Sequence, residues 1–247
     1  MAVKHARIVH DGRILDVQVD GGWVLTPDGR RLALHEVTFA PPCVPTKVIC
    51  VGFNYRDHAA ELKWEASVEP VLFLKPPSAV IGHDAPIPYP RHTTRLEYEG
   101  ELAVVIGRRG RHVPRNRALE YIDGYTLFND ITARDIQQTE KQWFRAKAFD
   151  ASAPLGPWIV REVDPRALDL VVRVNGEIRQ AGNTRDMVFD VAALIEIISF
   201  FVTLEPGDVI ATGTPRGVGP LQVGDVVEVE IPPIGILRNR VVEDAPP

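Results

Sequence analysis

The segment L-E-Y-E-G-E-L-A-V-V-I-G, residues 96–107, decides the fold and the site of this chain. Its second half is apolar and rich in β-branched residues, which predicts a strand that enters a core. Side chains alternate across a strand, so Glu97, Glu99 and Glu101 are expected on one face, with neighbours roughly 6.5 to 7 Å apart. Two such carboxylates can share one hard cation. A solvated strand face is the ordinary alternative, but Gly100 between the acids indicates that another group approaches closely.

The composition is that of a globular protein. Of 247 residues, 45% are hydrophobic and 25% charged, values typical of a chain with a buried core. The net charge of -5 and the lack of a basic cluster with interleaved aromatics argue against a nucleic-acid partner. No apolar run approaches membrane-spanning length, and the N-terminus lacks a signal-peptide core, so we expect a cytoplasmic protein without a membrane partner. Cys43 and Cys50 match no disulfide framework or zinc site.

Turn signals divide the beginning of the chain into short strands. Residues 3–39 alternate β-like runs with Asp11-Gly12, Asp20-Gly21-Gly22 and Pro27-Asp28-Gly29, which predicts a small antiparallel meander. Prolines 41, 42 and 45 then form a stiff connector. We therefore predict a small N-terminal β domain with its connector over residues 1–45, and a larger domain over residues 46–247.

The larger domain is predicted to be mostly β, with one clear helix. Apolar residues recur at helical spacing from Val188 to Val202, with Asp190 as the N-cap. The positions expected in the core are Phe189, Leu194, Ile197, Ile198 and Phe201. Asn175-Gly176 predicts a hairpin turn. Residues 74–78 and 85–90 contain prolines without periodicity, and we interpret them as ordered loops.

Several polar residues lie at positions that are common in active sites. His58 and Glu61 are neighbours on a helical turn, so the carboxylate can orient the imidazole and raise its basicity; a surface pair is the alternative. Asp130 follows a strand-like run at the expected start of a helix, which suits either N-capping or metal ligation. Lys147 lies among aromatic and small residues, which indicates a partly buried lysine.

The last motif along the chain is rich in glycine. Residues 206–219, P-G-D-V-I-A-T-G-T-P-R-G-V-G, match neither the dinucleotide fingerprint nor a P-loop, so we expect no nucleotide. The pattern instead predicts a loop whose backbone and hydroxyl groups approach a small ligand.

Together, these segments resemble the fumarylacetoacetate hydrolase family. Five motifs carry the resemblance in the family's order: G-F-N-Y-R-D-H-A-A-E at 52–61, L-E-Y-E-G-E-L-A-V-V-I-G at 96–107, N-D-I-T-A-R-D-I-Q at 129–137, K-A-F-D at 147–150, and the glycine-rich segment at 206–219. The resemblance covers roughly residues 46 to 243. It implies a mostly β (α+β) protein with a mixed β-roll catalytic core, preceded here by the small meander, and usually a homodimer.

The resemblance also implies roles for individual residues. The divalent-metal ligands correspond to Glu99, Glu101 and Asp130. The catalytic residues correspond to Lys147 and to a lid pair, His58 and Glu61. Positions that contact the acid or keto oxygens of the substrate correspond to Arg134, Gln137 and Thr214. Relatives commonly carry Asp at the position of Glu97, which is not a metal ligand in the family, so this departure is not expected to alter the reaction.

Three carboxylates without a Cys or His ligand suit Mg²⁺ or Mn²⁺, and no organic cofactor is expected. A 2-oxo acid can bind such an ion through its carboxylate and 2-oxo oxygen, so the ion stabilises an enolate, and Lys147 adds positive charge. We therefore predict a metal-dependent enzyme that acts on small 2-oxo or enol dicarboxylic acids.

The short length, the meander and the lid segment are most similar to 2-hydroxyhepta-2,4-diene-1,7-dioate isomerase and 5-oxopent-3-ene-1,2,5-tricarboxylate decarboxylase of aromatic catabolism. The alternatives are an acylpyruvate hydrolase or oxaloacetate decarboxylase of the same family, and a non-catalytic protein that binds metal or oxo acids.

Overall fold

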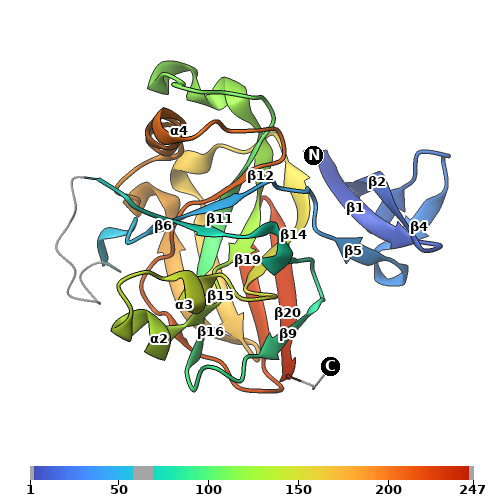
Figure 1. The fold of residues 1–247 in the computed structure, drawn as a ribbon. Helices are drawn as coiled ribbons and strands as arrows, with labels where there is room; N and C mark the ends of the chain where they lie inside the picture. The colour runs from blue at the N-terminus through green and yellow to red at the C-terminus, as the bar shows by residue number, and fades with distance from the viewer. Residues whose placement is uncertain (1–2, 58–68, 245–247) are drawn as a thin grey trace.

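The computed structural model of the chain describes residues 3–57 and 69–244. A small β lobe at the N-terminus stands beside a larger body that is also built mainly from strands (Figure 1). The expectation of a mostly β protein with mixed sheets is therefore confirmed. Within the described ranges, no helix is both long and apolar enough to cross a membrane.

The N-terminal lobe is the predicted antiparallel meander. Its strands are β1 (Lys4–His10), β2 (Arg13–Asp20), β3 (Trp23–Leu25), β4 (Arg31–Ala33) and β5 (Thr38–Ala40). Alternate apolar side chains form a separate small core, which contains Ala6, Ile8, Val17, Val19 and Val24. The lobe is not isolated, because β1 also pairs with β14 (Ala153–Val160) of the body. The domain boundary near residue 45 remains a prediction.

The largest sheet runs through both parts of the molecule. Its strand order is β4-β3-β2-β1-β14-β12-β11-β17-β6-β7. The body contributes β14, β6 (Val48–Gly52), β7 (Val71–Lys75), β11 (Gly100–Ile106), β12 (Ile122–Asn129) and β17 (Val209–Ala211), with β8 (Val80–Ile81) beside β14. β17 and β6 are parallel, whereas β11 is antiparallel to β12 and β17. The loop predicted over residues 74–78 is wrong at its start, because Leu74 and Lys75 end a strand.

A second sheet of five strands packs against this one, in the order β16-β15-β19-β20-β9. Its strands are β9 (Pro86–Tyr89), β15 (Asp169–Val174), β16 (Glu177–Asn183), β19 (Val226–Ile231) and β20 (Gly235–Glu243). The predicted hairpin turn at Asn175-Gly176 joins β15 to β16. The loop predicted over residues 85–90 is wrong, because β9 forms the edge of this sheet, where proline removes no needed ladder bond. A third, short sheet contains β10 (Leu96–Tyr98), β13 (Thr132–Ala133) and β18 (Gly219–Pro220).

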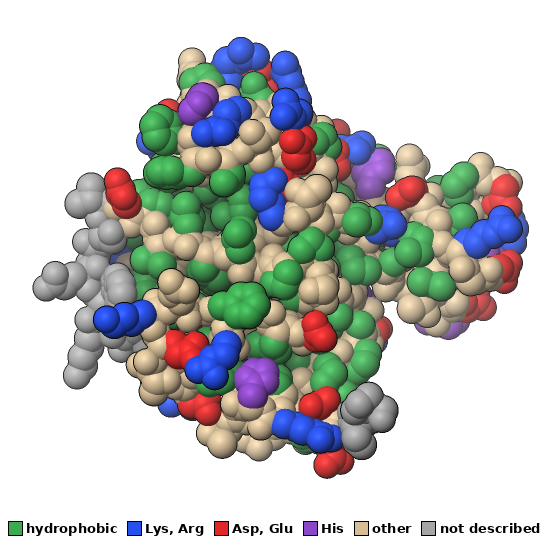
Figure 2. All heavy atoms as spheres, viewed as in Figure 1, with side chains coloured by type: hydrophobic (Ala, Val, Ile, Leu, Met, Phe, Trp, Pro, Cys, Tyr) green, Lys and Arg blue, Asp and Glu red, His purple; other side chains and the backbone are tan. Residues whose placement is uncertain are grey.

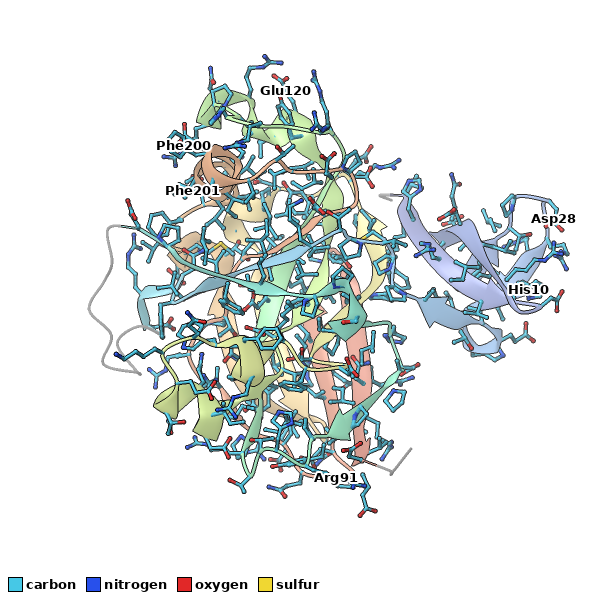
Figure 3. All side chains as sticks on the ribbon, in the orientation of Figure 1. His10, Asp28, Arg91, Glu120, Phe200 and Phe201 are labelled. Carbon is cyan, nitrogen blue, oxygen red and sulfur yellow. The ribbon has the colours of Figure 1, made fainter. Side chains whose placement is uncertain are left out.

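In the described residues, helices are few and short. They are α2 (Arg134–Thr139), α3 (Phe144–Lys147) and α4 (Val191–Phe201), with 3₁₀ turns at Leu34–Glu36, Pro77–Ala79, Arg115–Tyr121, Pro165–Ala167 and Thr184–Asp186. α4 is the predicted helix, and Asp190 caps it by accepting a hydrogen bond from Ala193 N at 2.8 Å. Leu194 and Ile198 are buried as predicted, but Phe201 is 62% exposed, so its assignment to the core is wrong. Figure 3 shows Phe200 and Phe201 side by side on this helix, and their rings meet edge to face with centroids 5.3 Å apart.

The surface mixes charges of both signs. Figure 2 shows acidic and basic side chains interspersed with apolar ones on the viewed face. The acids of residues 96–107 are not part of this surface, since Glu97, Glu99 and Glu101 are at most 5% exposed. The solvated strand face is therefore excluded.

Candidate active site

Strand pairing brings Asp130 to the glutamates. β11 and β12 are antiparallel with Gly100 opposite Asn129 and Glu101 opposite Phe128. Continuing this register by one residue sets Glu99 opposite Asp130, and Asp130 N donates to Glu99 O at 2.9 Å. The alternative role of Asp130 as a helix N-cap is excluded, because β13 intervenes and Ala133 precedes the first residue of α2. Ligand oxygens of Glu99, Glu101 and Asp130 all lie within 4.8 Å of one another.

Gly100 permits the sheets to meet behind this cluster. A Cβ atom at this position would lie 2.3 Å from Val172 Cγ2 of β15 and 3.2 Å from Val229 Cγ1 of β19. Both distances are shorter than ordinary contacts, and both neighbours are buried in the core. The glycine between the acids is therefore required by the close packing of the two sheets, which is the close approach that the sequence indicated.

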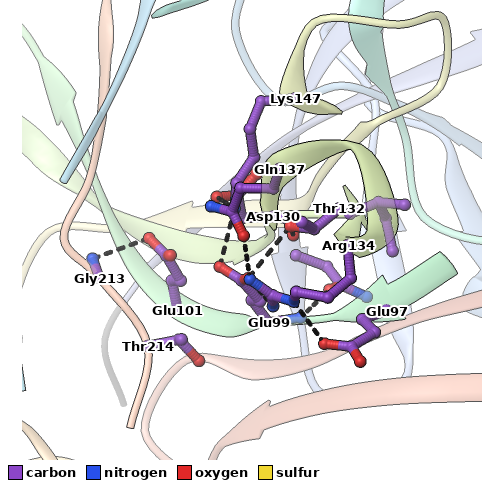
Figure 4. Close-up of polar contacts among 12 residues, drawn as sticks. Glu97, Glu99, Glu101, Asp130, Thr132, Arg134, Gln137, Lys147, Gly213 and Thr214 are labelled. Atoms are coloured by element: carbon purple, nitrogen blue, oxygen red, sulfur yellow. Dashed lines mark hydrogen bonds and ion pairs between the residues drawn. The ribbon is translucent and has the colours of Figure 1, made fainter. Parts of the chain in front are cut away.

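Glu97 has a different role from the other acids. It lies in β10, and the chain passes from the short sheet to the large one at Glu99. Its carboxylate accepts from Arg134 Nε at 2.6 Å and from Arg95 Nε at 2.7 Å. The guanidinium of Arg134 also contacts Glu99 Oε1 and, one helical turn on, Gln137 Oε1 (Figure 4). Glu97 thus fixes Arg134 beside the cluster and is not itself part of the cluster.

Lys147, the last residue of α3, contacts the carboxylate cluster. Its side chain is 2% exposed, and Nζ lies 3.0 Å from Glu99 Oε2 and 2.5 Å from Asp130 Oδ2. Burial alone would lower the pKa of Lys147, but the negative charges of Asp130 and Glu99 outweigh it and raise the pKa above the ordinary value. The lysine therefore stays protonated, and the sequence correctly indicated that it is buried.

A second buried lysine was missed by the sequence analysis. Lys75, the last residue of β7, has Nζ 2.8 Å from Asp130 Oδ1, and it donates to the carbonyl oxygens of Ile131, Lys147 and Ser152 at 3.0, 2.5 and 2.8 Å. Burial lowers the pKa of Lys75, and the charge of Asp130 opposes that effect. The available signal was the run of strand-forming residues before it, which places a lysine inside the sheet.

Glu101 is held from the glycine-rich segment. Gly213 N donates to Glu101 Oε2 at 2.8 Å, and Gly213 has a φ of +97°. A Cβ there would lie 2.7 Å from Asn54 Cβ, so only glycine allows this approach. Next to it, the Thr214 hydroxyl donates to Gly100 O at 2.8 Å and accepts from Gln180 Nε2 at 2.9 Å. The loop therefore approaches the cluster through backbone and hydroxyl groups, as its composition predicted.

The charges of the site favour a divalent cation. Four buried carboxylates, those of Glu97, Glu99, Glu101 and Asp130, face three buried cations, those of Lys75, Arg134 and Lys147. Glu101 takes part in no ion pair in the described chain, and burial together with Asp130 and Glu99 raises its pKa well above the ordinary value. Three hard oxygen donors with an excess of negative charge fit Mg²⁺ or Mn²⁺. With all four carboxylates ionised, such an ion would change the formal charge of these groups from -1 to +1, which suits an anionic ligand.

The cluster borders a very small cavity of about 10 Å³. Glu99, Glu101, Asp130, Arg134, Gln137, Lys147 and Thr214 all contribute to its lining, so the structure brings together seven of the nine predicted site residues. The other two, His58 and Glu61, lie outside the described residues.

Comparison with known proteins agrees with this geometry. Residues 47–242 match the family model described as fumarylacetoacetate (FAA) hydrolase, C-terminal, and the chain therefore belongs to the fumarylacetoacetate hydrolase family, whose members are enzymes. The chain is 45% identical over 224 residues to the oxaloacetate tautomerase of Bacillus subtilis, covering 85% of this chain and 74% of that protein.

Two solved structures have closely similar folds over almost the whole chain. The 5-carboxymethyl-2-hydroxymuconate delta-isomerase from Mycobacterium smegmatis is 42% identical with a TM-score of 0.91, covering 98% of this chain and all of that one. The 2-hydroxyhepta-2,4-diene-1,7-dioate isomerase from Mycobacterium marinum is 39% identical with a TM-score of 0.91, covering 99% of this chain and all of that one.

Proposed function

We propose that this protein is a divalent-metal-dependent isomerase that acts on small 2-oxo dicarboxylic acids by moving a proton at C3. The observation that carries the proposal is the buried group of three carboxylates with two cationic side chains, Lys147 and Arg134, directly against it. A divalent ion bound by Glu99, Glu101 and Asp130 would supply positive charge that lowers the energy of the substrate's enolate.

The protein's own residues would divide the remaining tasks. Lys147 brings a buried positive charge to the place where negative charge develops, and such a fixed charge acts strongly away from water. Arg134, held by Glu97 and beside Gln137, can orient a substrate carboxylate. From the family resemblance, we assign proton transfer at C3 to His58, oriented by Glu61.

Two substrates are candidates. The first is 2-hydroxyhepta-2,4-diene-1,7-dioate, the substrate predicted from the sequence, and the names of both similar structures support an isomerase of this kind. The second is oxaloacetate, whose keto–enol conversion moves a proton at C3 through the same kind of enolate, and the Bacillus subtilis relative favours it. Decarboxylation and C–C hydrolysis also proceed through an enolate, and they would appear as loss of carbon from the product. The expected homodimer is part of the proposal and can be tested by sedimentation.

Exchange of C3 hydrogens with D₂O tests the proposal directly. The protein is loaded with Mg²⁺ or Mn²⁺, and NMR follows exchange and products for both candidate substrates. Exchange that requires the metal and is lost in Glu101→Gln is the expected result. A protein that binds metal and oxalate but exchanges no 2-oxo acid would instead be the non-catalytic binding protein.

A further inference from the structure

A groove of about 830 Å³ opens beside the carboxylate cluster, between β7 and the loop that joins α2 to α3. The groove shares five lining residues with the small cavity at the cluster, namely Phe53, Phe73, Arg134, Gln137 and Trp143. The groove and the small cavity are therefore adjacent. Pockets of this size hold ligands much larger than a four-carbon acid, so most of the groove is available to a part of the ligand that does not react.

The part of the groove next to the cluster has an aromatic wall. The Trp143 ring lies edge-on to Phe53 and Phe73, with centroid distances of 5.8 and 5.4 Å. A Cβ on Gly52 would lie 3.1 Å from the Trp143 ring, so glycine lets the indole pack closely onto β6. Fixed aromatic faces of this kind favour contact with a flat, apolar group.

A free positive charge lies among the more exposed lining residues. Lys141 belongs to the α2–α3 loop and, in the described chain, it has no ion pair. Glu140 also lines the groove, but it pairs with Arg145. Arg134 is neutralised by Glu97 and Glu99 at the cluster end. The groove therefore has the buried carboxylate cluster at one end and, among the described residues, an unpaired cation elsewhere along it.

We propose that this groove is the subsite for the far end of the substrate, with Trp143 against an apolar spacer and Lys141 against a second carboxylate. This assignment rests on the proposed function and narrows its substrate class to 2-oxo or 2-hydroxy dicarboxylic acids longer than four carbons. Trp143 and Lys141 determine specificity and do not take part in the proton transfer.

The test compares diacids with monoacids of equal length. The seven-carbon pair is 2-oxoheptanedioate and 2-oxoheptanoate, and the four-carbon pair is oxaloacetate and 2-oxobutyrate. Calorimetry on the Mn²⁺-loaded protein gives the affinity, and NMR gives C3 exchange. In the wild type, we expect the long diacid to bind about three- to fivefold more tightly than the long monoacid, the usual strength of one accessible ion pair.

Single substitutions then separate the two contacts. Lys141→Gln should bring the seven-carbon affinity ratio close to one without changing the affinity for the monoacid, whereas Lys4→Gln, at a partly buried lysine of the N-terminal lobe, should leave the ratio intact. Trp143→Ala should weaken both seven-carbon acids more than the four-carbon pair, and Trp143→Phe should restore most of that loss.

A ratio that is the same in Lys141→Gln and the wild type would overturn the subsite. That result, with C3 exchange intact, would leave the proposed function standing. Absence of exchange for every acid, with the Lys141-dependent affinity ratio preserved, would instead reject the proposed function and keep the subsite.

Discussion

Lys75 Nζ lies 2.8 Å from Asp130 Oδ1, and both side chains are almost completely excluded from solvent. The same ammonium group binds three carbonyl oxygens, one of which belongs to Lys147. One buried cation therefore holds a candidate metal ligand and the backbone of the candidate catalytic lysine in a fixed relation.

We expect Lys75→Met to destabilise the metal-free protein by about 3 to 5 kcal/mol, because Asp130 and three carbonyl groups lose their buried donor. Urea unfolding measures the loss. Lys47→Met is the matched control, since Lys47 also pairs with a buried aspartate, Asp208, but is itself partly exposed and remote from the cluster. An equal or smaller loss in Lys75→Met than in the control would contradict this role.

Glu101→Gln should have opposite effects on folding and on metal binding. The change removes one of three like charges packed within 4.8 Å while an amide oxygen can still accept from Gly213. We expect the metal-free protein to become more stable, by about 1 kcal/mol, and Mn²⁺ affinity to fall at least about tenfold. Thermal unfolding and calorimetry of the same preparation give both quantities. Unchanged metal affinity would remove Glu101 from the ligand set.

Gly100→Ala tests the packing behind the cluster. The added methyl group would overlap Val172 Cγ2, so the sheets must separate, at a cost of about 1 to 3 kcal/mol or more. Adding Val172→Ala to the same chain should recover part of the loss, giving a coupling energy of about 1 kcal/mol in a double-mutant cycle. Strictly additive losses would show that the two positions do not share this contact.

The lowered pKa of Asp208 predicts the pH below which the protein loses part of its free energy of unfolding. Burial would raise its pKa, but hydrogen bonds from Lys47 and Thr46 outweigh burial and hold the pKa below the ordinary value. A lowered pKa stabilises the fold above the unfolded-state value, and that contribution disappears as pH falls through the folded-state value. Stability should therefore drop below about pH 4.

In Asp208→Asn, the slope of unfolding free energy against pH should be shallower below about pH 4. At pH 7, the variant should be less stable by about 1 to 3 kcal/mol, because Thr46, Lys47 and Glu205 direct donors at this carboxylate. Asp16→Asn, at a side chain that is 92% exposed, serves as the control. Parallel pH profiles for wild type and Asp208→Asn would refute the assignment.

His58→Ala tests the proposed proton transfer. Because charge stabilisation is assigned to other residues, this variant should keep metal and oxalate binding but lose about 10²- to 10⁴-fold in C3 exchange, the usual contribution of a positioned base. Exchange at the wild-type rate would place the base elsewhere.

The sequence predicted much of the candidate site because the acids occur in short motifs whose spacing is local. Glu99 and Glu101 are two residues apart, Asp130 and Lys147 stood out by their surroundings, and the family resemblance placed them in one site with the glutamates. Lys75 was missed because its partners are 56 to 77 residues away in the chain, and only the folded sheet brings them together. Sequence spacing carries no information about such contacts.

Local patterns also explain the errors in the fold. The helical period around Asp190 correctly placed α4, yet it could not show that Phe201, in the last turn, is left exposed. The prolines of β9 suggested a loop, but their effect on a strand depends on whether that strand is central or at an edge. That position is set by the whole topology.

The pairing of β1 with β14 determines how the protein would behave without its N-terminal lobe. Lys4 to Ala6 cover Trp158 to Val160 along one side of β14. Removing the N-terminal lobe would leave these apolar residues on an open strand edge, which can add a strand from another molecule. The shortened protein would then precipitate through intermolecular β-pairing, even with every residue of the carboxylate cluster in place.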